Sequence, residues 1–360
     1  MENEELQSKV IAFLRFPLII GVVFIHYYGS TVFVQGIEIG VVNNADIPIY
    51  HITNKLFNCI LGGGIRNPFF FFISGFFFFS HTNFNRNSYS KKLKNRIKSL
   101  LIPYLFWNIA WLLMFYIVPN IPILSTWVNG SERNYSLEHI LFSLWPHPIS
   151  GQFWFIRDLM VVGLLTPIVY PYIKQFKIYG VLLLGILWYK GYWFSFISTH
   201  GLSITALFFF TAGAWFSINK KNLVEEFGKI KNISFYLYPL IVIIDLLTKG
   251  SSYNYLIFRL GILLGIAFFF NLVSCLLKNG KIRVNAFLSA SSFFIFAIHM
   301  PWLLSPIKKI FFKLFEPTSD VLLTFFHFMI PFLIVCISLI LYYLLKRFCP
   351  AFTKIITGGR

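Results

Sequence analysis

The strongest constraint on the fold is a succession of long apolar segments that runs through almost the whole chain. A helix needs roughly 20 mostly apolar residues to cross the hydrocarbon core of a bilayer. We predict about ten such spans, at residues 10–34, 56–80, 100–118, 153–171, 178–190, 202–217, 233–248, 255–277, 286–305 and 321–345. The fifth is short, and it is tilted, partly re-entrant or extended towards residue 193. These lengths favour helices, because barrel strands span only about 9–11 residues.

The composition of the chain indicates the same class. Charged residues form 12% of the 360 residues and hydrophobic residues form 57%, whereas about a quarter of a soluble domain is charged. The mean hydropathy is +0.70, and no linker rich in Pro, Gly or Ser divides the chain. We therefore expect an all-α integral membrane protein with a single transmembrane domain over residues 1–360.

The net charge of +18 indicates membrane topology rather than nucleic-acid binding. If the N-terminus is cytoplasmic, the predicted inner segments hold 20 of the 31 Lys and Arg residues and the outer loops hold seven. An excess of basic residues on the cytoplasmic side is typical of multi-pass membrane proteins. We predict that both termini are cytoplasmic and that nucleic acid is not a partner.

Two simpler features concern processing and metals. The N-terminus is acidic, and no small-residue cleavage site follows the first apolar run, so we expect no cleaved signal peptide. The four cysteines show no metal-binding or redox spacing, so we expect inert thiols and no metal. They are Cys59, Cys275, Cys336 and Cys349.

Arg15 and His26 are ionisable residues inside the first predicted span, where such residues are costly. Eleven residues are about three helical turns, so both side chains project from one face, separated by roughly 16 Å along the axis. Taken singly, a snorkelling Arg and a hydrogen-bonded structural His are the plainer interpretations. Their shared face favours a common polar cavity.

The second span and the basic stretch after it add further polar groups. Arg66 lies near mid-span and needs a partner or water, whereas the small pair Ser74 and Gly75 allows close helix packing. Lys94 and Arg96 belong to a basic stretch that precedes the third span. These charges suit membrane orientation alone, and they also suit a phosphorylated ligand, because Arg binds phosphate through two hydrogen bonds.

Two pairs of charged residues occur in later spans, one within the fourth span and one divided between the seventh and the eighth. Trp154, Arg157 and Asp158 open the fourth span. Because adjacent helical residues do not face one another, we expect Arg157 and Asp158 to contact different partners. Asp245 and Arg259 lie at similar depths in the seventh and eighth spans, and we predict that they pair across an antiparallel hairpin.

His299 lies near the middle of the ninth span, beside Pro301, which loosens the helix. A lone buried His is more often structural than functional. A second intramembrane histidine, His26, together with several arginines, favours a polar reaction chamber or a translocation path.

Five motifs in sequence order resemble those of the acyltransferase 3 family of bacterial membrane acyltransferases. They are Arg15 and His26 separated by ten residues, Phe71-Phe72-Ile73-Ser74-Gly75-Phe76, the basic stretch from Arg96 to Pro103-Tyr104, Trp154-Phe155-Ile156, and Phe296-Ala297-Ile298-His299-Met300-Pro301. The last motif departs from the family at Phe296, where Tyr is usual, so no Tyr hydroxyl acts there.

The resemblance implies transfer of an acyl group, usually acetyl from acetyl-CoA, to a hydroxyl of a cell-surface carbohydrate or glycolipid. It implies a multi-pass protein of the bacterial cytoplasmic (inner) membrane, whose partners are acetyl-CoA, a carbohydrate or lipid-linked glycan and the lipid bilayer. The chain resembles the stand-alone type without a fused esterase-like domain. The acceptor, the acyl chain of the donor and the oligomeric state stay open.

Roles follow from this resemblance and from the chemistry of the residues. We assign catalysis to His26, Arg15 and His299, with His26 as general base on the acceptor hydroxyl. A route in which His26 first accepts the acyl group is equally open. Arg66, Ser74 or His299 stabilises the oxyanion.

Binding roles go to a second set of residues. Coenzyme A enters from the cytoplasm, and we assign its binding to Arg15, Arg96, Lys94, Arg66 and Ser74. We assign substrate binding to Trp154, Arg157 and Asp158. The acceptor pocket is expected at the outer ends of the spans, with the loops at 35–55 and 119–152.

Two other classes of protein are the rivals. A secondary transporter or glycan exporter would use Arg15, His26 and His299 as a proton or substrate path, and it would not bind acetyl-CoA. A sensor or scaffold would leave the buried charges without a role.

Overall fold

The computed structural model describes residues 2–30, 32–34, 37–39, 47–60, 63–80, 84–117, 121 and 136–359. Helices account for nearly all regular structure in these ranges, so the predicted helical class is confirmed. The strands in the described part are β1 (Val32–Val34) and β2 (Ile37–Ile39), which form an antiparallel hairpin with Val32 opposite Ile39. Much of the predicted loops at 35–55 and 119–152 lies outside the described residues.

Among the described residues, five helices are long and apolar enough to cross a membrane. They are α1 (Asn3–Gly29), the continuous helix Arg86–Met114, α14 (Asn254–Lys278), the helix Ala286–Phe315 and α17 (Asp320–Phe348). The pair Gly151–Leu164 and Thr166–Lys190, bent by 65°, makes a sixth if it counts as one span. The chain is therefore a multi-pass helical protein, and the number of ten spans stays a prediction.

Helix breaks account for the difference from the predicted spans. The second predicted span is divided into α2 (Pro48–Ile60) and α3 (Arg66–Phe79). Two others form helices of only 15 and 17 residues, α11 (Ile204–Ile218) and α13 (Lys231–Leu247). The fourth breaks at Leu165, between α8 (Trp154–Leu164) and α9 (Thr166–Lys190), because Pro167 favours a helix start.

The chain forms two compact units, each assembled from separated segments. The first unit contains residues 1–18, 62–100 and 155–289, and the second contains residues 19–61, 101–154 and 290–360. The assignment of residues 1–360 to one functional domain stays a prediction.

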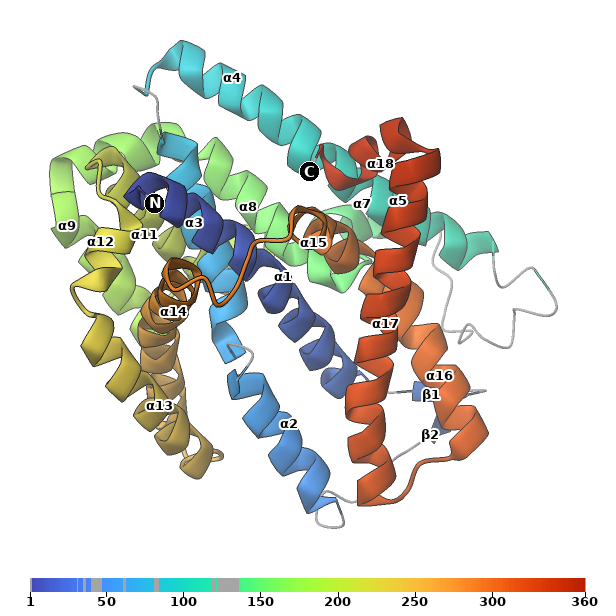
Figure 1. The fold of residues 1–360 in the computed structure, drawn as a ribbon. Helices are drawn as coiled ribbons and strands as arrows, with labels where there is room; N and C mark the ends of the chain where they lie inside the picture. Colours follow the sequence, from blue (N-terminus) through green and yellow to red (C-terminus); the bar gives the residue numbers. More distant parts are fainter. Residues whose placement is uncertain are drawn as a thin grey trace. The chain divides into compact units, whose positions relative to one another are not determined.

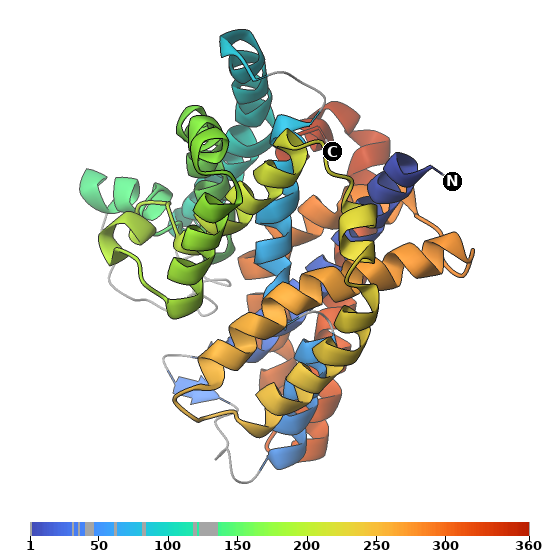
Figure 2. The same cartoon turned by 90° about the vertical axis from the view of Figure 1, so that its left-hand side faces the viewer.

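In the first unit, α3 packs closely along α11 (Figure 1). A Cβ atom on Gly75 would overlap the carbonyl oxygen of Phe210, and one on Gly213 would overlap that of Phe72. Glycine at both positions lets the two backbones approach, which confirms the packing role predicted for Gly75. The helices α13 and α14 run side by side as a hairpin (Figures 1 and 2), and α12 (Leu223–Gly228) packs on α14.

In the second unit, α2 packs along α17. The Asp320 carboxylate at the start of α17 accepts hydrogen bonds from the backbone N–H groups of Ile49 and Tyr50, at 2.8 and 2.7 Å. It thereby caps the N-terminus of α2, where N–H groups lack intrahelical partners. The short α18 (Pro350–Thr357) packs on α5 (Ile102–Ile117), where the Trp107 indole donates to Ile356 O at 3.0 Å.

The ninth predicted span is longer than expected. It consists of α15 (Ala286–Ile298), the π-helical turn η6 (His299–Leu303) and α16 (Leu304–Phe315). Lys308 and Lys309, predicted to lie in an outer loop, are buried in α16 with 5% and 7% exposure. The Lys308 ammonium donates to Tyr27 O at 2.9 Å and to Ser30 Oγ at 3.1 Å, so it satisfies the C-terminal end of α1.

Candidate active site

The second unit contains a pair of histidines, one from α1 and one from η6. Nδ1 of His26 lies 2.7 Å from Nε2 of His299. The ring planes are nearly parallel, at 7°, with centroids 5.0 Å apart; this is an edge-to-edge arrangement in which each nitrogen points at the other ring. His299 is fully buried and His26 is partly exposed. The fold thus joins two histidines that are 273 residues apart.

Backbone carbonyls decide which ring donates this hydrogen bond. Nδ1 of His299 lies 2.8 Å from Phe296 O and 3.1 Å from Ile295 O. Because a carbonyl oxygen accepts, this Nδ1 carries the hydrogen, and Nε2 of the neutral ring is the acceptor. Nδ1–H of His26 therefore donates to His299, which places the lone pair of a neutral His26 on Nε2.

This geometry changes the role expected of His299. Its Nδ1–H is used by the two carbonyls and its Nε2 by His26, so the neutral ring has no second N–H for an oxyanion. Its position instead orients His26 and fixes the tautomer, as a neighbouring hydrogen bond commonly does for a reactive histidine.

The helix is interrupted where His299 lies. Met300 is extended, with φ −137° and ψ 136°, and Pro301 has no backbone N–H to continue the helical ladder. The loosening predicted for Pro301 is confirmed. The break turns the chain between α15 and α16 directly beside the histidine pair.

In the first unit, two residues predicted to bind the cofactor contact each other. The Arg96 guanidinium at the end of α4 (Arg86–Arg96) donates to Ser74 Oγ at 2.7 Å and to Ser74 O at 3.3 Å. It also lies over the rings of Phe78 and Phe210, 5.2 and 6.0 Å from their centroids. Within the described ranges no carboxylate forms an ion pair with Arg96, so its charge is balanced by hydroxyl, carbonyl and aromatic groups.

Lys92 is a neighbour that the sequence reasoning missed. It lies one turn before Arg96 and donates to Phe78 O and, at 3.5 Å, to Ser80 O. Both cations therefore contact the C-terminal half of α3. The i,i+4 spacing from Arg96 was the available signal, whereas the predicted Lys94 is exposed to solvent.

Arg157 and Asp158 form an ion pair, so the prediction of different partners is wrong. Nη2 of Arg157 lies 2.9 Å from Asp158 Oδ1, and Nε lies 3.2 Å from the same oxygen. Both residues turn towards one segment: Arg157 donates to Thr199 O at 2.8 Å and to Ser198 O at 3.4 Å, and Asp158 Oδ2 accepts from Ser203 N at 3.3 Å. A long Arg side chain can curl back to its neighbour when both serve a common target.

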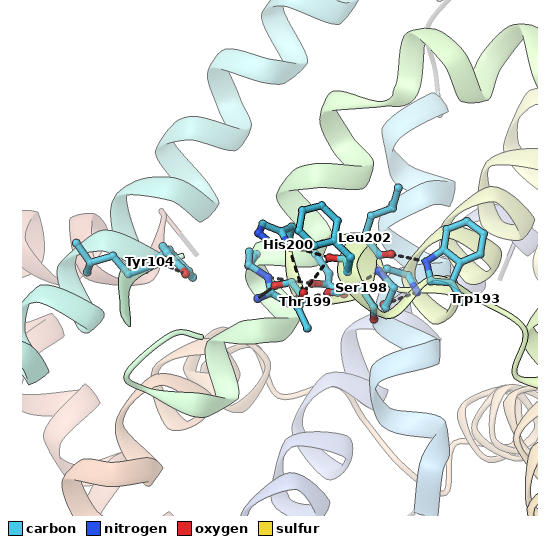
Figure 3. Close-up of polar contacts among 12 residues, drawn as sticks. Tyr104, Trp193, Ser198, Thr199, His200 and Leu202 are labelled. Atoms are coloured by element: carbon cyan, nitrogen blue, oxygen red, sulfur yellow. Dashed lines mark hydrogen bonds and ion pairs between the residues drawn. The ribbon is translucent and has the colours of Figure 1, made fainter. Parts of the chain in front are cut away.

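The segment that this pair holds has its own internal contacts (Figure 3). The Trp193 indole donates to Leu202 O at 2.7 Å, and the Thr199 hydroxyl lies 3.2 Å from His200 Nδ1. The contacts of Arg157 and Asp158 thus fix the connection between α9 and α11. Their assignment to substrate binding stays a prediction.

The ion pair predicted between Asp245 and Arg259 is also wrong. Asp245 pairs with Lys249 one turn later, at 2.8 Å. Arg259 instead donates to the carbonyls of Trp188 and Tyr189, the latter at 3.0 Å, at the end of α9. The carbonyls at a helix C-terminus lack intrahelical partners, and they attract the guanidinium as a carboxylate would.

The other predicted site residues divide between the units. The residues assigned to coenzyme A binding all belong to the first unit. Among them, Arg66 is 3% exposed and Arg15 is partly exposed. Trp154 opens α8 and belongs to the second unit, as do the two histidines. In the described part of the chain no group of three or more His, Cys, Asp or Glu side chains is placed to hold a metal ion.

Comparison with known proteins identifies the family of this chain. A family model described as an acyltransferase domain matches residues 10–343, which include the histidine pair and the Arg96–Ser74 contact. The chain belongs to the acyltransferase 3 family. The family assignment makes the protein an acyltransferase, and the apolar helices make it a multi-pass membrane protein.

A curated relative supports the assignment. The succinoglycan biosynthesis protein ExoH of Rhizobium meliloti (strain 1021) is 23% identical over 283 residues, which cover 76% of this chain and 73% of that protein. No solved structure matches the chain.

Proposed function

We propose that the protein transfers an acetyl group from acetyl-CoA to a hydroxyl of a cell-surface carbohydrate or glycolipid, in the bacterial cytoplasmic membrane. The observation that carries this proposal is the His26–His299 pair, whose hydrogen bonds place a basic lone pair on His26 Nε2. A relative that takes part in succinoglycan biosynthesis supports a polysaccharide or its lipid-linked precursor as the acceptor.

The chemical step uses His26 as general base. Nε2 takes the proton of the acceptor hydroxyl as its oxygen attacks the thioester carbonyl carbon. The tetrahedral intermediate then collapses, the C–S bond breaks, and the proton on Nε2 passes to the departing thiolate. The products are an O-acyl ester and free coenzyme A, with the enzyme unchanged. His299 accepts from His26 Nδ1–H throughout, so it stabilises the positive charge that develops on His26.

The first unit supplies the groups proposed to bind the donor. Arg96, Ser74 and Lys92 gather along the C-terminal half of α3 without an acidic partner among the described residues, which suits a phosphate ligand. Arg15 and Arg66 are proposed to extend this binding into the bundle. We further propose ten spans with both termini cytoplasmic, which the distribution of Lys and Arg supports.

The test compares surface glycans of cells with and without this gene. Loss of O-acetyl groups in the deletion strain, restored by the wild-type gene but not by His26→Ala, is the expected result. To identify the acyl chain, purified protein is supplied with acetyl-CoA or succinyl-CoA, and the mass of the glycan product is measured. Two results would favour the rival function of a transporter or glycan exporter. One is a deletion strain in which glycan export fails while acetylation persists, and the other is glycan export by this protein that continues after coenzyme A is depleted.

A further inference from the structure

Gln152 is a buried residue beside the histidine pair that none of the motifs includes. It lies in the short 3-10 turn η5 (Gly151–Phe153), and it is 3% exposed. Its Nε2 donates to Ala297 O at 3.3 Å and to Met300 O. These carbonyls flank His299 on both sides of the helix break.

Both carbonyls have lost their regular helical partners, for two different reasons. In an α-helix the carbonyl of residue i accepts from the N–H of residue i+4. The partner of Ala297 would be Pro301, which has no N–H. The partner of Met300 would be Leu304, whose N–H donates to His299 O instead. An unsatisfied buried carbonyl is costly, and more so in an apolar bundle.

A carboxamide nitrogen has two hydrogens, which is what the two carbonyls require. Since both contacts are to acceptors, the nitrogen of Gln152 must face them and the oxygen must face away. That oxygen, Oε1, is buried without a hydrogen-bond partner among the described residues. A buried acceptor left unsatisfied is a cost that native proteins accept mainly at functional sites. We conclude that the position of Gln152 serves the two hydrogen bonds that its amide nitrogen donates.

The turn that presents Gln152 is itself held in place. The backbone N–H of Ser150 donates to Asn108 Oδ1 at 3.2 Å, and Asn108 Nδ2 donates to Tyr104 O at 2.8 Å. The ring of Phe153 packs against that of Phe296, with centroids 5.4 Å apart. A continuous set of contacts thus runs from α5 through η5 to the break that contains His299.

We infer that Gln152 is a positioning residue for the histidine pair. Its carboxamide replaces the two N–H donors that the break removes, and so holds His299 where Nε2 meets His26. The inference rests on the proposed function, because its main readout is acyl transfer.

The experiment uses full-length protein with two variants that keep the size of the side chain. Gln152→Met removes the donor, and Gln152→Glu puts an oxygen in place of the amide nitrogen. We expect kcat to fall about 10- to 100-fold, because a small misplacement of a catalytic group is enough for such a loss. The KM values for donor and acceptor should change little. Gln7→Met is the matched control, since Gln7 also bonds to a backbone group, Leu223 N at 2.7 Å, but in the first unit.

A double-mutant cycle separates positioning from general stability. In the His299→Ala background, Gln152→Met should lower kcat by less than about 2-fold, because two residues that act through one another are not additive. Unchanged kcat in a folded Gln152→Met protein, or an equal loss in both backgrounds, would overturn the inference. Failure of both Gln152 variants to fold would overturn it too, because the residue would then hold the whole fold. If the wild type itself releases no thiol from acetyl-CoA, the proposed function fails instead.

Discussion

The two units place polar groups in an apolar helical protein in different ways. Both units hold cations: in the first, Arg96 is satisfied by Ser74 and aromatic rings and Arg157 by Asp158 and carbonyls, and in the second, Lys308 is satisfied by the end of α1. The second unit places a pair of imidazoles and an amide where a helix is broken. Fixed charge suits the binding of an anion, whereas an imidazole with a defined tautomer suits proton transfer. The difference predicts that changes in the first unit alter binding or folding, and that changes at the histidine pair alter the chemical step.

The largest effect is expected from His26→Ala. Loss of a general base lowers kcat by about 10²- to 10⁴-fold, with the KM for acetyl-CoA nearly unchanged. The measurement is the rate of acceptor-dependent thiol release by purified protein. His147→Ala, which alters an exposed histidine of the same unit, should keep full activity. A rise in the donor KM as the main effect of His26→Ala would break the division of roles between the units.

The next effect is on folding, from Arg157→Met. This variant leaves Asp158 buried without its ion pair, and the free energy of unfolding should fall by about 3–5 kcal/mol. Replacing both residues with apolar ones, as in Arg157→Met with Asp158→Leu, should recover much of this loss. Denaturant unfolding in detergent measures both. If Arg157→Met is as stable as the wild type but binds acceptor poorly, the pair serves the substrate rather than the connection between α9 and α11.

A smaller effect, on binding alone, is expected from Arg96→Ala. A hydrogen bond from a charged group is worth about 1.5–3 kcal/mol, so the KM for acetyl-CoA should rise about 10- to 100-fold while kcat is kept. Lys91→Ala is the control; because Lys91 is exposed on the same helix and has no assigned role, the KM of this variant for acetyl-CoA should change less than about 3-fold. Steady-state kinetics at varied acetyl-CoA measures the difference. A loss of kcat without a change in KM would place Arg96 with the reacting groups.

The smallest effect concerns packing in the first unit. Gly75→Ala adds a methyl group against the Phe210 carbonyl and should destabilise the protein by about 1–3 kcal/mol. Gly228→Ala, where nothing beyond the adjacent residues and the backbone of its own helix lies within 4 Å of the added carbon, should leave the unfolding free energy nearly unchanged. Thermal unfolding of the two variants side by side tests whether α3 and α11 are as closely packed as described.

The sequence predicted the helical class, Arg15 and His26 on one helix, and the loosened helix beside His299, because each depends on local composition and spacing. It did not predict which groups the charged side chains contact. The contacts of Arg259 with the end of α9, and of Arg157 with its neighbour, depend on which helix ends come together in the fold. No sequence pattern pointed to Gln152. Pro301 shows that one backbone carbonyl lacks its helical donor, but it does not show which distant side chain supplies a hydrogen bond instead.

The number of spans shows a similar limit. Apolar runs of sufficient length predict crossings, yet a run can be divided by a break such as the one at Leu165, or extended through a π-helical turn, as at His299. Such breaks depend on packing and on prolines whose effect varies with context. The basic residues Lys308 and Lys309 were assigned to a loop for this reason, although they lie in α16.

The most direct test of the account is a single-turnover assay of wild-type and His26→Ala protein in membranes, with radiolabelled acetyl-CoA and isolated surface glycan. We expect label on glycan hydroxyls and an equal amount of free thiol for the wild type. For a folded His26→Ala protein we expect both to form about 10²- to 10⁴-fold more slowly. Acceptor-dependent labelling by His26→Ala at the wild-type rate would contradict the central claim that His26 is the base for acyl transfer.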